Sequence, residues 1–351
     1  MRRWLPEWYS PKSPASAADN FAAMQARLGA FLLAVVVALC GPPAAANAQA
    51  ADFDLVAHRG GSGETTEESL RAFAKSLELG VSTLEFDIGI TKDHQPVVWH
   101  DLTIEPTKCA DTAPAFAADP QYPYVGKLVH ELTLAQIRML DCGKLLSEFP
   151  NAEVVLGNKI ATLPDVFALT GSYRADVRYD IETKVDAADP ARTAGPQEFV
   201  DVILAAVRAA GKVGRVEIES FDWRTLPMAR QAEPSIPLVA LWNEATWTPG
   251  SVWLAGINPA VVRDPIVGAR IVGADIVSPD YAIVDEALVN RAHMLGLKVI
   301  PATVNDADAM RALIAAGADG IVTDYPTLLR RVMTELALPL PPIYRRELNP
   351  Q

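Results

Sequence analysis

The sequence predicts an α/β protein folded as a TIM (β/α)8 barrel with an insertion after the second barrel strand. Short β-rich runs alternate with amphipathic runs of about 10–15 residues, which is the pattern of parallel βαβ units. About eight such units in roughly 285 residues fit a closed barrel better than an open sheet. The first strand leads into the glycine-rich run 58–63, which lacks the Gly-x-Gly-x-x-Gly spacing of open dinucleotide-binding sheets.

Strands are expected where β-branched and aromatic residues cluster. They are residues 53–58, 83–90, 96–100, 177–183, 216–221, 238–242, 276–278, 299–304 and 320–323. Helices are expected where apolar residues recur every three or four positions, and the first has Leu70, Phe73 and Leu77 at this spacing before Gly80 ends it. The expected helices are 67–79, 163–169, 199–210, 223–232, 286–295, 307–316 and 328–336.

Two stretches interrupt this alternation. Residues 102–160 are long, irregular and rich in Pro, Asp and Ala, and an insert after the end of a strand usually contributes to a substrate pocket. Residues 243–258, with the residue before them, bring Trp242, Trp247 and Trp253 close together in the sequence. We expect these indoles to pack within the loop, and the alternative is an aromatic wall for a small bound alcohol.

The amino-terminal segment is typical of a secretory signal peptide. Arg27 precedes the uncharged apolar run 28–39, and small residues follow as far as Ala48 and Ala50, an A-x-A cleavage pattern. The run is shorter than the ~20 residues that cross a bilayer, so we expect no stable membrane span. Cleavage after Ala50 would release an exported protein, periplasmic or secreted. Met24 is a candidate for the true start, because the segment before the apolar run is long for a signal.

Three segments follow along the chain. They are the signal peptide at 1–50, the barrel with its insertion at 51–340, and a carboxyl-terminal tail at 341–351. Cys109 and Cys142 both fall in the insertion and remain after cleavage. Because an exported protein meets an oxidising environment, we expect a disulfide between them, and two inert thiols are the alternative.

The chain is acidic, with a formal net charge of -12. A non-specific nucleic-acid binder needs a basic face, so no nucleic-acid partner is expected. The same charge is compatible with an anionic phosphate ligand, because a bound divalent cation reverses the sign of an acidic site.

Carboxylates recur near the ends of the expected strands. Glu85 and Asp87 lie two apart in one strand and therefore point to one face, and Glu182 lies at the end of another. Charged side chains at the carboxyl ends of barrel strands point into the mouth, where active sites lie. Three converging buried acids are costly unless they bind a cation. All-oxygen ligation predicts one divalent metal ion, Ca2+ or Mg2+.

Histidines and basic residues lie at the same strand ends. His58 and Arg59 follow the first strand, His100 closes a later one, and Lys184 lies two residues after Glu182. Two histidines beside a metal can serve as general acid and base, while Arg59 and Lys184 can hold phosphoryl oxygens. Taken one at a time, these charged residues could also form a surface ion pair or a polar face of a strand. Their joint placement at successive strand ends favours a site for phosphodiester cleavage. The remaining histidines are expected to be surface or structural residues: His94, His130 and His293.

The order of these motifs is itself informative. Between residues 58 and 101 the motifs HRG, E-x-D, TKD and HD follow one another, and ETK, SF, TVN and GIVTDYP follow at 182–184, 220–221, 303–305 and 320–326. In order and spacing they resemble those of the glycerophosphodiester phosphodiesterase family over nearly all of residues 53–335. The resemblance implies a TIM barrel of the phospholipase-C-like phosphodiesterase type, with the family's small insertion at 102–160.

The resemblance also implies roles for individual residues. The implied residues are the metal ligands Glu85, Asp87 and Glu182, the acid–base pair His58 and His100, the phosphate contacts Arg59 and Lys184, and the orienting residue Glu67. Two positions depart from the family pattern, since Glu68 replaces an Asn and Ala302 replaces a Trp. The first change adds a carboxyl group near the site and the second removes an aromatic wall.

The predicted reaction is metal-dependent hydrolysis of a small-molecule glycerophosphodiester to glycerol 3-phosphate and an alcohol, by two-histidine acid–base chemistry. One alternative is a phospholipase on the same barrel, of the D type or cleaving phosphatidylinositol, which would need an apolar entrance for an intact lipid. Another is a non-catalytic envelope binding protein. The complete set of two histidines and three carboxylates disfavours it, because binding alone does not require both histidines.

Overall fold

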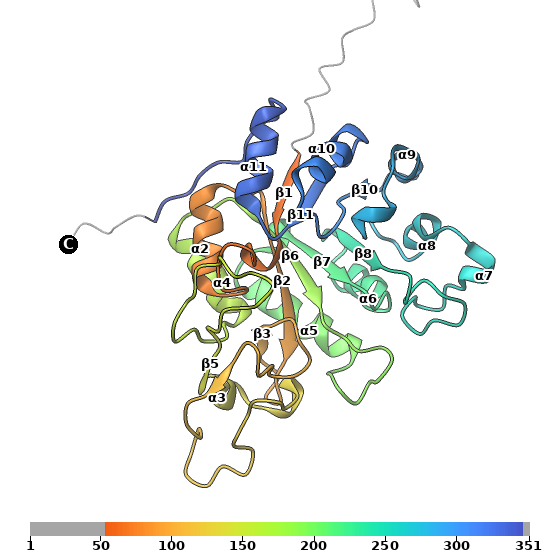
Figure 1. Cartoon of the computed structure of the whole chain (residues 1–351). Helices are drawn as coiled ribbons and strands as arrows, with labels where there is room; N and C mark the ends of the chain where they lie inside the picture. Colours follow the sequence, from red (N-terminus) through yellow and green to blue (C-terminus); the bar gives the residue numbers. More distant parts are fainter. Residues whose placement is uncertain (1–52, 347–351) are drawn as a thin grey trace, which may run out of the picture. The chain divides into compact units, whose positions relative to one another are not determined.

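The computed structural model describes residues 53–346, which form the predicted barrel (Figure 1). Eight parallel strands build it: β1 (Asp54–Ala57), β2 (Thr83–Ile90), β6 (Arg178–Thr183), β7 (Val216–Ser220), β8 (Leu238–Trp242), β9 (Ile276–Pro279), β10 (Lys298–Val299) and β11 (Gly320–Thr323). They pair in the order β10-β9-β8-β7-β6-β2-β1-β11. The TIM-barrel prediction is confirmed.

Backbone hydrogen bonds close the barrel between β10 and β11. The amide of Asp319 donates to the carbonyl of Val299 at 2.8 Å, and the amide of Val322 donates to that of Pro301 at 3.0 Å. The strand expected at 299–304 is shorter than predicted. Pro279 of β9 has no amide hydrogen to donate to this strand, so the regular pairing of β10 with β9 ends early, although the amides of Ile300 and Ala302 still donate to β9 carbonyls at 3.0 and 3.1 Å.

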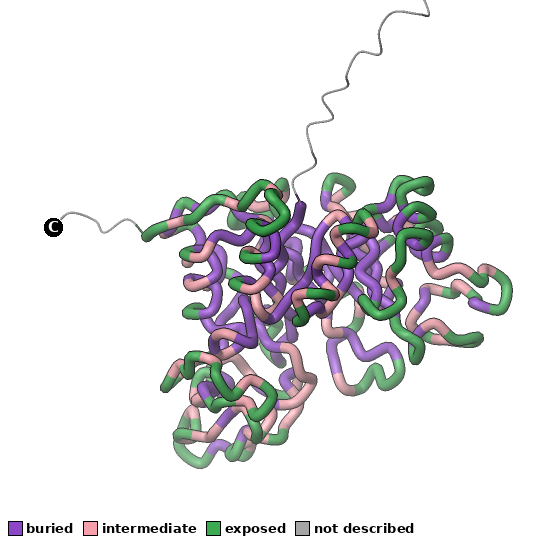
Figure 2. The backbone as a smooth tube through the Cα atoms, turned by 45° about the horizontal axis from the view of Figure 1, so that its top comes forward, coloured by how far each residue is buried: buried purple, intermediate pink, exposed green. Residues whose placement is uncertain are grey.

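A helix follows each barrel strand along the chain and covers the barrel from outside. These helices are α2 (Leu70–Leu79), α4 (Leu163–Ser172), α5 (Pro196–Ala209), α6 (Thr225–Ala232), α8 (Pro265–Ile271), α9 (Glu286–Met294), α10 (Ala307–Ala315) and α11 (Pro326–Glu335). Figure 2 shows the strands buried and the outer faces of the helices exposed. Each helix therefore turns its apolar face inward, as the sequence periodicity predicts.

The start of the first helix and two short helices differ from expectation. The first helix begins at Leu70 rather than at residue 67, because the Ser69 hydroxyl accepts the Ala72 amide at 3.0 Å and caps it there. The short helices α7 (Pro259–Val262) and α8 were not predicted. Their signal was present in the sequence, since each has Pro in its first turn preceded by a capping residue, Asn258 or Asp264.

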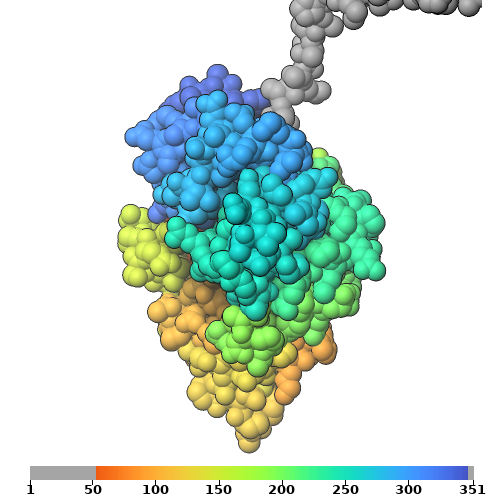
Figure 3. All heavy atoms as spheres, turned by 90° about the vertical axis from the view of Figure 1, so that its right-hand side faces the viewer, coloured from red at the N-terminus to blue at the C-terminus, as the bar shows by residue number. Residues whose placement is uncertain are grey.

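The insertion after β2 is a small lobe with its own core. The strand β3 (Pro96–Val98), which pairs antiparallel with β2, leads into it. The lobe then contains β4 (Ala110–Asp111), the 3-10 turn η2 (Val129–Glu131), α3 (Leu134–Ile137) and β5 (Leu140–Asp141). Apolar side chains from this segment form a separate buried cluster, and the predicted Cys109–Cys142 disulfide lies within it. Figure 3 shows the lobe, in yellow, projecting from one end of the barrel.

The predicted signal peptide at 1–50 lies outside the described residues, as does the end of the tail, 347–351. Within residues 53–346, none of the helices is both long and apolar enough to cross a membrane.

Candidate active site

Three carboxylates meet at the carboxyl end of the barrel. β2 carries Glu85 and Asp87 on one face, and β6 holds Glu182 in register with Asp87. One oxygen of each residue lies within 4.8 Å of the others, and all three side chains are buried. Burial, followed by the charge of Asp87, raises the pKa of Glu85 well above its ordinary value. Such a cluster gains stability from a bound cation.

Two partly buried cations partly compensate this charge. Lys184 Nζ lies 2.9 Å from Glu182 Oε1 and 3.4 Å from Asp87 Oδ1, and Arg59 Nε lies 3.3 Å from Asp87 Oδ2. Burial lowers the pKa of Lys184, but the charges of Glu182 and Asp87 outweigh burial and hold it above its ordinary value. Both cations therefore stay charged at the mouth, where an anionic phosphate would enter.

His58 is oriented by a chain of hydrogen bonds from the last strand. Its Nδ1 lies 2.6 Å from Asp324 Oδ1, and Asp324 Oδ2 accepts the Asn305 amide at 2.6 Å. A carboxylate only accepts, so Nδ1 carries the hydrogen and Nε2, 4.0 Å from Glu85, faces the carboxylate cluster as a proton acceptor. Burial raises the pKa of Asp324, but the hydrogen bond from His58, together with the positive charge of that ring when it is protonated, outweighs burial and holds the pKa low.

His100 reaches the mouth by a route that the sequence reasoning did not foresee. The run 96–100 was expected to be a strand ending like the parallel ones, whereas β3 is antiparallel and returns along β2 from beyond the barrel. Trp99 follows it and donates its amide to the Asp87 carbonyl at 3.0 Å, which places His100 beside the carboxylates. His100 Nδ1 lies 3.0 Å from Asp101 Oδ1. Burial lowers the pKa of His100, and the charge of Asp87 opposes it only in part.

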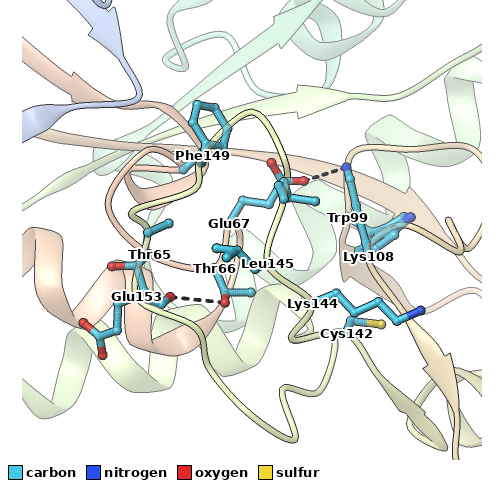
Figure 4. Close-up of a pocket in the computed structure, with 13 residues that line it drawn as sticks. Thr65, Thr66, Glu67, Trp99, Lys108, Cys142, Lys144, Leu145, Phe149 and Glu153 are labelled. Carbon is cyan, nitrogen blue, oxygen red and sulfur yellow. Dashed lines mark hydrogen bonds and ion pairs between the residues drawn. The ribbon is translucent and has the colours of Figure 1, made fainter.

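Glu67 connects the barrel to the insertion. Its two oxygens contact Arg59 Nη1 at 3.2 Å and Lys108 Nζ at 2.6 Å. Figure 4 shows Lys108 reaching Glu67, and the Lys108 ammonium also lies 5.3 Å from the centre of the Trp99 ring. Lys108 additionally pairs with Asp101, whose pKa falls to about 2 because hydrogen bonds from His100 and Lys108 outweigh burial. Glu67 thus contacts Arg59 and, through Lys108, connects it to the His100 side of the site.

Glu68, which departs from the family pattern, acts on the backbone. Its Oε1 accepts the Asp87 amide at 3.0 Å and its Oε2 accepts the His100 amide at 2.9 Å. The side chain is buried, and Glu68 has a left-handed backbone (φ 55°) that turns it away from α2. Burial raises its pKa well above the ordinary value. One carboxyl group therefore fixes the strand end that carries Asp87 and the loop that carries His100.

The mouth opens into three adjoining cavities that all include His100. The central one, of about 240 Å³, contains both histidines together with Glu85 and Glu182. A second, of about 500 Å³, lies between the insertion and the loops after β6, β7 and β8, and a third, of about 530 Å³, lies between Arg59 and residues 145–148. A diester bound at the carboxylates would therefore have separate space for its two ends.

The tryptophans divide between the two expected roles. Trp247 packs against buried Trp223 with ring centres 5.7 Å apart, whereas Trp242 lines the central cavity and Trp253 lines the second. Ala302 also lines the central cavity, so the space left by the missing family Trp adjoins Trp242.

Of the other histidines, His94 and His293 lie away from this site, whereas His130 lines a small cavity that Asp101 and Lys184 also line. His94 is exposed and contacts Glu198 at 2.5 Å, and His293 Nε2 contacts Asp319 at 2.8 Å. His130 lies in η2 of the insertion.

Sequence reasoning missed three residues that orient the expected ones. Asp324 contacts His58, Asn305 holds Asp324, and Lys108 contacts Glu67 and Asp101. Asp324 directly follows β11, so the rule of polar residues at strand ends applied to it as well. Lys108 had no such signal, because the insertion brings it to the site from a distance in sequence.

The fold and the site define a barrel enzyme of phosphate-ester chemistry, with two oriented histidines and two cations around an acidic cluster. The model of the glycerophosphoryl diester phosphodiesterase family matches residues 58–328. The chain belongs to this family and is a phosphoric diester hydrolase.

Individual relatives agree with this assignment. A glycerophosphodiester phosphodiesterase of Caldanaerobacter subterraneus is 27% identical over 78% of this chain and 95% of its own length. One from Bacillus subtilis is 28% identical over 79% of this chain and 85% of its own length. A solved structure assigned as a glycerophosphoryl diester phosphodiesterase from Silicibacter pomeroyi superposes with a TM-score of 0.71 at 29% identity, covering 82% of this chain and 95% of that one.

Proposed function

We propose that this protein hydrolyses glycerophosphodiesters to glycerol 3-phosphate and an alcohol, with one divalent metal ion and a pair of histidines. The observation that carries the proposal is the carboxylate cluster, within 4.8 Å, beside His58 and His100 at one barrel mouth. Each histidine has its own carboxylate partner, Asp324 or Asp101. This is the arrangement that acid–base cleavage of a phosphodiester requires.

The carboxylate cluster fits a divalent metal ion. Asp87 Oδ2 is buried and accepts no hydrogen bond within residues 53–346, and it pairs only with Arg59 Nε at 3.3 Å, so its lone pairs are not all used and it can act as a ligand. Glu85, Asp87 and Glu182 would hold the ion, and their oxygen ligands suit Ca2+ or Mg2+. When bound, such an ion neutralises phosphoryl charge and polarises the phosphorus–oxygen bonds.

The other side chains of the site have separate roles in the proposed reaction. Arg59 and Lys184 bind the non-bridging phosphoryl oxygens and stabilise the negative charge that develops there. One histidine accepts the proton of the nucleophile, and the other protonates the leaving alkoxide. Asp324 and Asp101 keep each ring in the tautomer that presents Nε2 to the substrate.

The chain's segments and location belong to the same proposal. Residues 1–50 are a signal peptide, residues 51–340 the barrel with its insertion, and the protein acts in the periplasm or outside the cell. The Cys109–Cys142 disulfide supports this, because disulfides persist in oxidising compartments.

The test is turnover of glycerophosphocholine and glycerophosphoethanolamine by the mature protein, followed by release of glycerol 3-phosphate. Activity should require Ca2+ or Mg2+, disappear with chelator, and fall at least about 100-fold in His58→Ala and Glu85→Gln. His94→Ala and Glu131→Gln are matched controls, since both residues are exposed and lie outside the mouth. They should retain full activity.

Other results would replace the proposal. Cleavage of intact phospholipid vesicles with no turnover of the soluble diesters would identify a phospholipase. Failure to cleave any diester with either metal would favour the envelope binding protein.

A further inference from the structure

The second cavity of the mouth has a chemical character of its own. It measures about 500 Å³ and reaches the reacting centre through His100, Glu182 and Lys184. Beyond these its wall includes Phe221, which follows β7, and Trp253, from the loop after β8. Both rings are only partly buried, so part of their surface is open to a ligand.

Most charges in this cavity are already paired. Glu182 contacts Lys184 at 2.9 Å, and Asp186 contacts Arg192 at 3.3 Å. Asp101 contacts Lys108. These carboxylates therefore leave little net charge to attract a ligand.

Glu105 is the exception. Its carboxylate accepts a hydrogen bond from Thr103, and within residues 53–346 it has no cationic partner. It comes from the insertion and lines the same cavity as Phe221 and Trp253. An unpaired carboxylate beside open aromatic rings is the chemistry that selects an organic cation, because the ring faces attract an ammonium and the carboxylate neutralises it.

We propose that this cavity binds the alcohol end of the diester, and that it selects an alcohol that carries an ammonium group. The proposal rests on the proposed function, since it assigns the leaving group of that reaction. His100 borders both this cavity and the carboxylate cluster, so an alcohol seated here leaves next to a histidine that can protonate it. Neutral or anionic alcohols gain nothing from Glu105, and anionic ones are repelled by it.

The experiment compares kcat/KM for two cationic diesters, glycerophosphocholine and glycerophosphoethanolamine, with that for neutral glycerophosphoglycerol. The variants are Glu105→Gln and Trp253→Ala, with Glu131→Gln as the control because it removes an exposed carboxylate of the same insertion. Wild type should prefer the cationic diesters. Each variant should lower the ratio of kcat/KM on the cationic diesters to kcat/KM on glycerophosphoglycerol by about twofold to thirtyfold, mainly through KM of the cationic diesters.

A binding readout is independent of turnover. Choline alone should bind wild-type protein by calorimetry, bind more weakly to Glu105→Gln, and bind unchanged to Glu131→Gln. Equal kcat/KM for neutral and cationic diesters in wild type, or equal choline binding by Glu105→Gln, would overturn the assignment of this cavity while hydrolysis stands. Failure to hydrolyse any of the three diesters would instead overturn the proposed function.

Discussion

Replacing Asp324 by Asn tests how His58 is held. The Asp324 carboxylate accepts from two donors, His58 Nδ1 at 2.6 Å and the Asn305 amide at 2.6 Å. An Asn side chain has only one acceptor oxygen, so its NH2 group must face one of these donors. Asn305 cannot simply flip, because its own oxygen already accepts from the backbone amide of residue 324 and from Thr323 Oγ1. The clash between the two donors can be avoided if His58 changes tautomer, so that Nδ1 accepts a hydrogen bond. The hydrogen then lies on Nε2, which can no longer accept a proton.

The size of the effect follows from this hydrogen bond. A bond to a charged group contributes about 1.5–3 kcal/mol, and about 1.4 kcal/mol corresponds to a tenfold change in rate. We therefore expect Asp324→Asn to lower kcat by about 10- to 150-fold with the metal requirement unchanged.

The assay is release of glycerol 3-phosphate from glycerophosphocholine between pH 5 and 9, with thermal unfolding as a check on folding. Glu198→Gln is the matched control, because it removes the carboxylate partner of the exposed His94 on the surface. A kcat within twofold of wild type for Asp324→Asn across this range would refute the orienting role. A similar loss in Glu198→Gln would point to a general effect of charge.

Three further outcomes are expected. Replacing both Cys109 and Cys142 by Ser should lower the free energy of unfolding by about 4 kcal/mol, because the disulfide closes a loop with a sequence separation of 33. A loss of less than about 1 kcal/mol, measured by chemical denaturation, would contradict this. Burial raises the pKa of Glu182 to about 7, so the folded state holds a proton that the unfolded state releases near 4.5. In chelator, the free energy of unfolding should therefore fall as pH rises from about 4.5 to 7, and added Ca2+ or Mg2+ should restore it. A melting temperature that rises over this pH range would contradict the prediction. Glu68→Ala should lower the free energy of unfolding by about 1–3 kcal/mol, and Glu68→Gln should lower it less, since Gln keeps one acceptor for the two backbone amides. Urea midpoints equal to that of wild type would show that these two hydrogen bonds contribute nothing.

Local periodicity was enough to predict the barrel. The helices and strands follow from apolar spacing and glycine stops, and most of their boundaries fall within a few residues of the structure. Two errors have identifiable causes: Ser69 caps α2 three residues later than expected, and Pro279 of β9, which has no amide hydrogen, ends the regular pairing of β10 early. The strand containing Pro96 was recognised, but its direction was not, because strand direction depends on pairing partners that local sequence does not encode.

The sequence by itself determined the fold class and the residues that β2 and β6 carry to the mouth, because side chains two apart in a strand share a face and parallel strands end together. The tertiary structure decided which groups orient them. Asp324 meets His58 across 266 positions of the chain, and Lys108 and Glu105 reach the mouth from the folded insertion. Such contacts depend on how separate segments pack against one another, so hydrogen-bond partners and cavity charge have no signature in local periodicity.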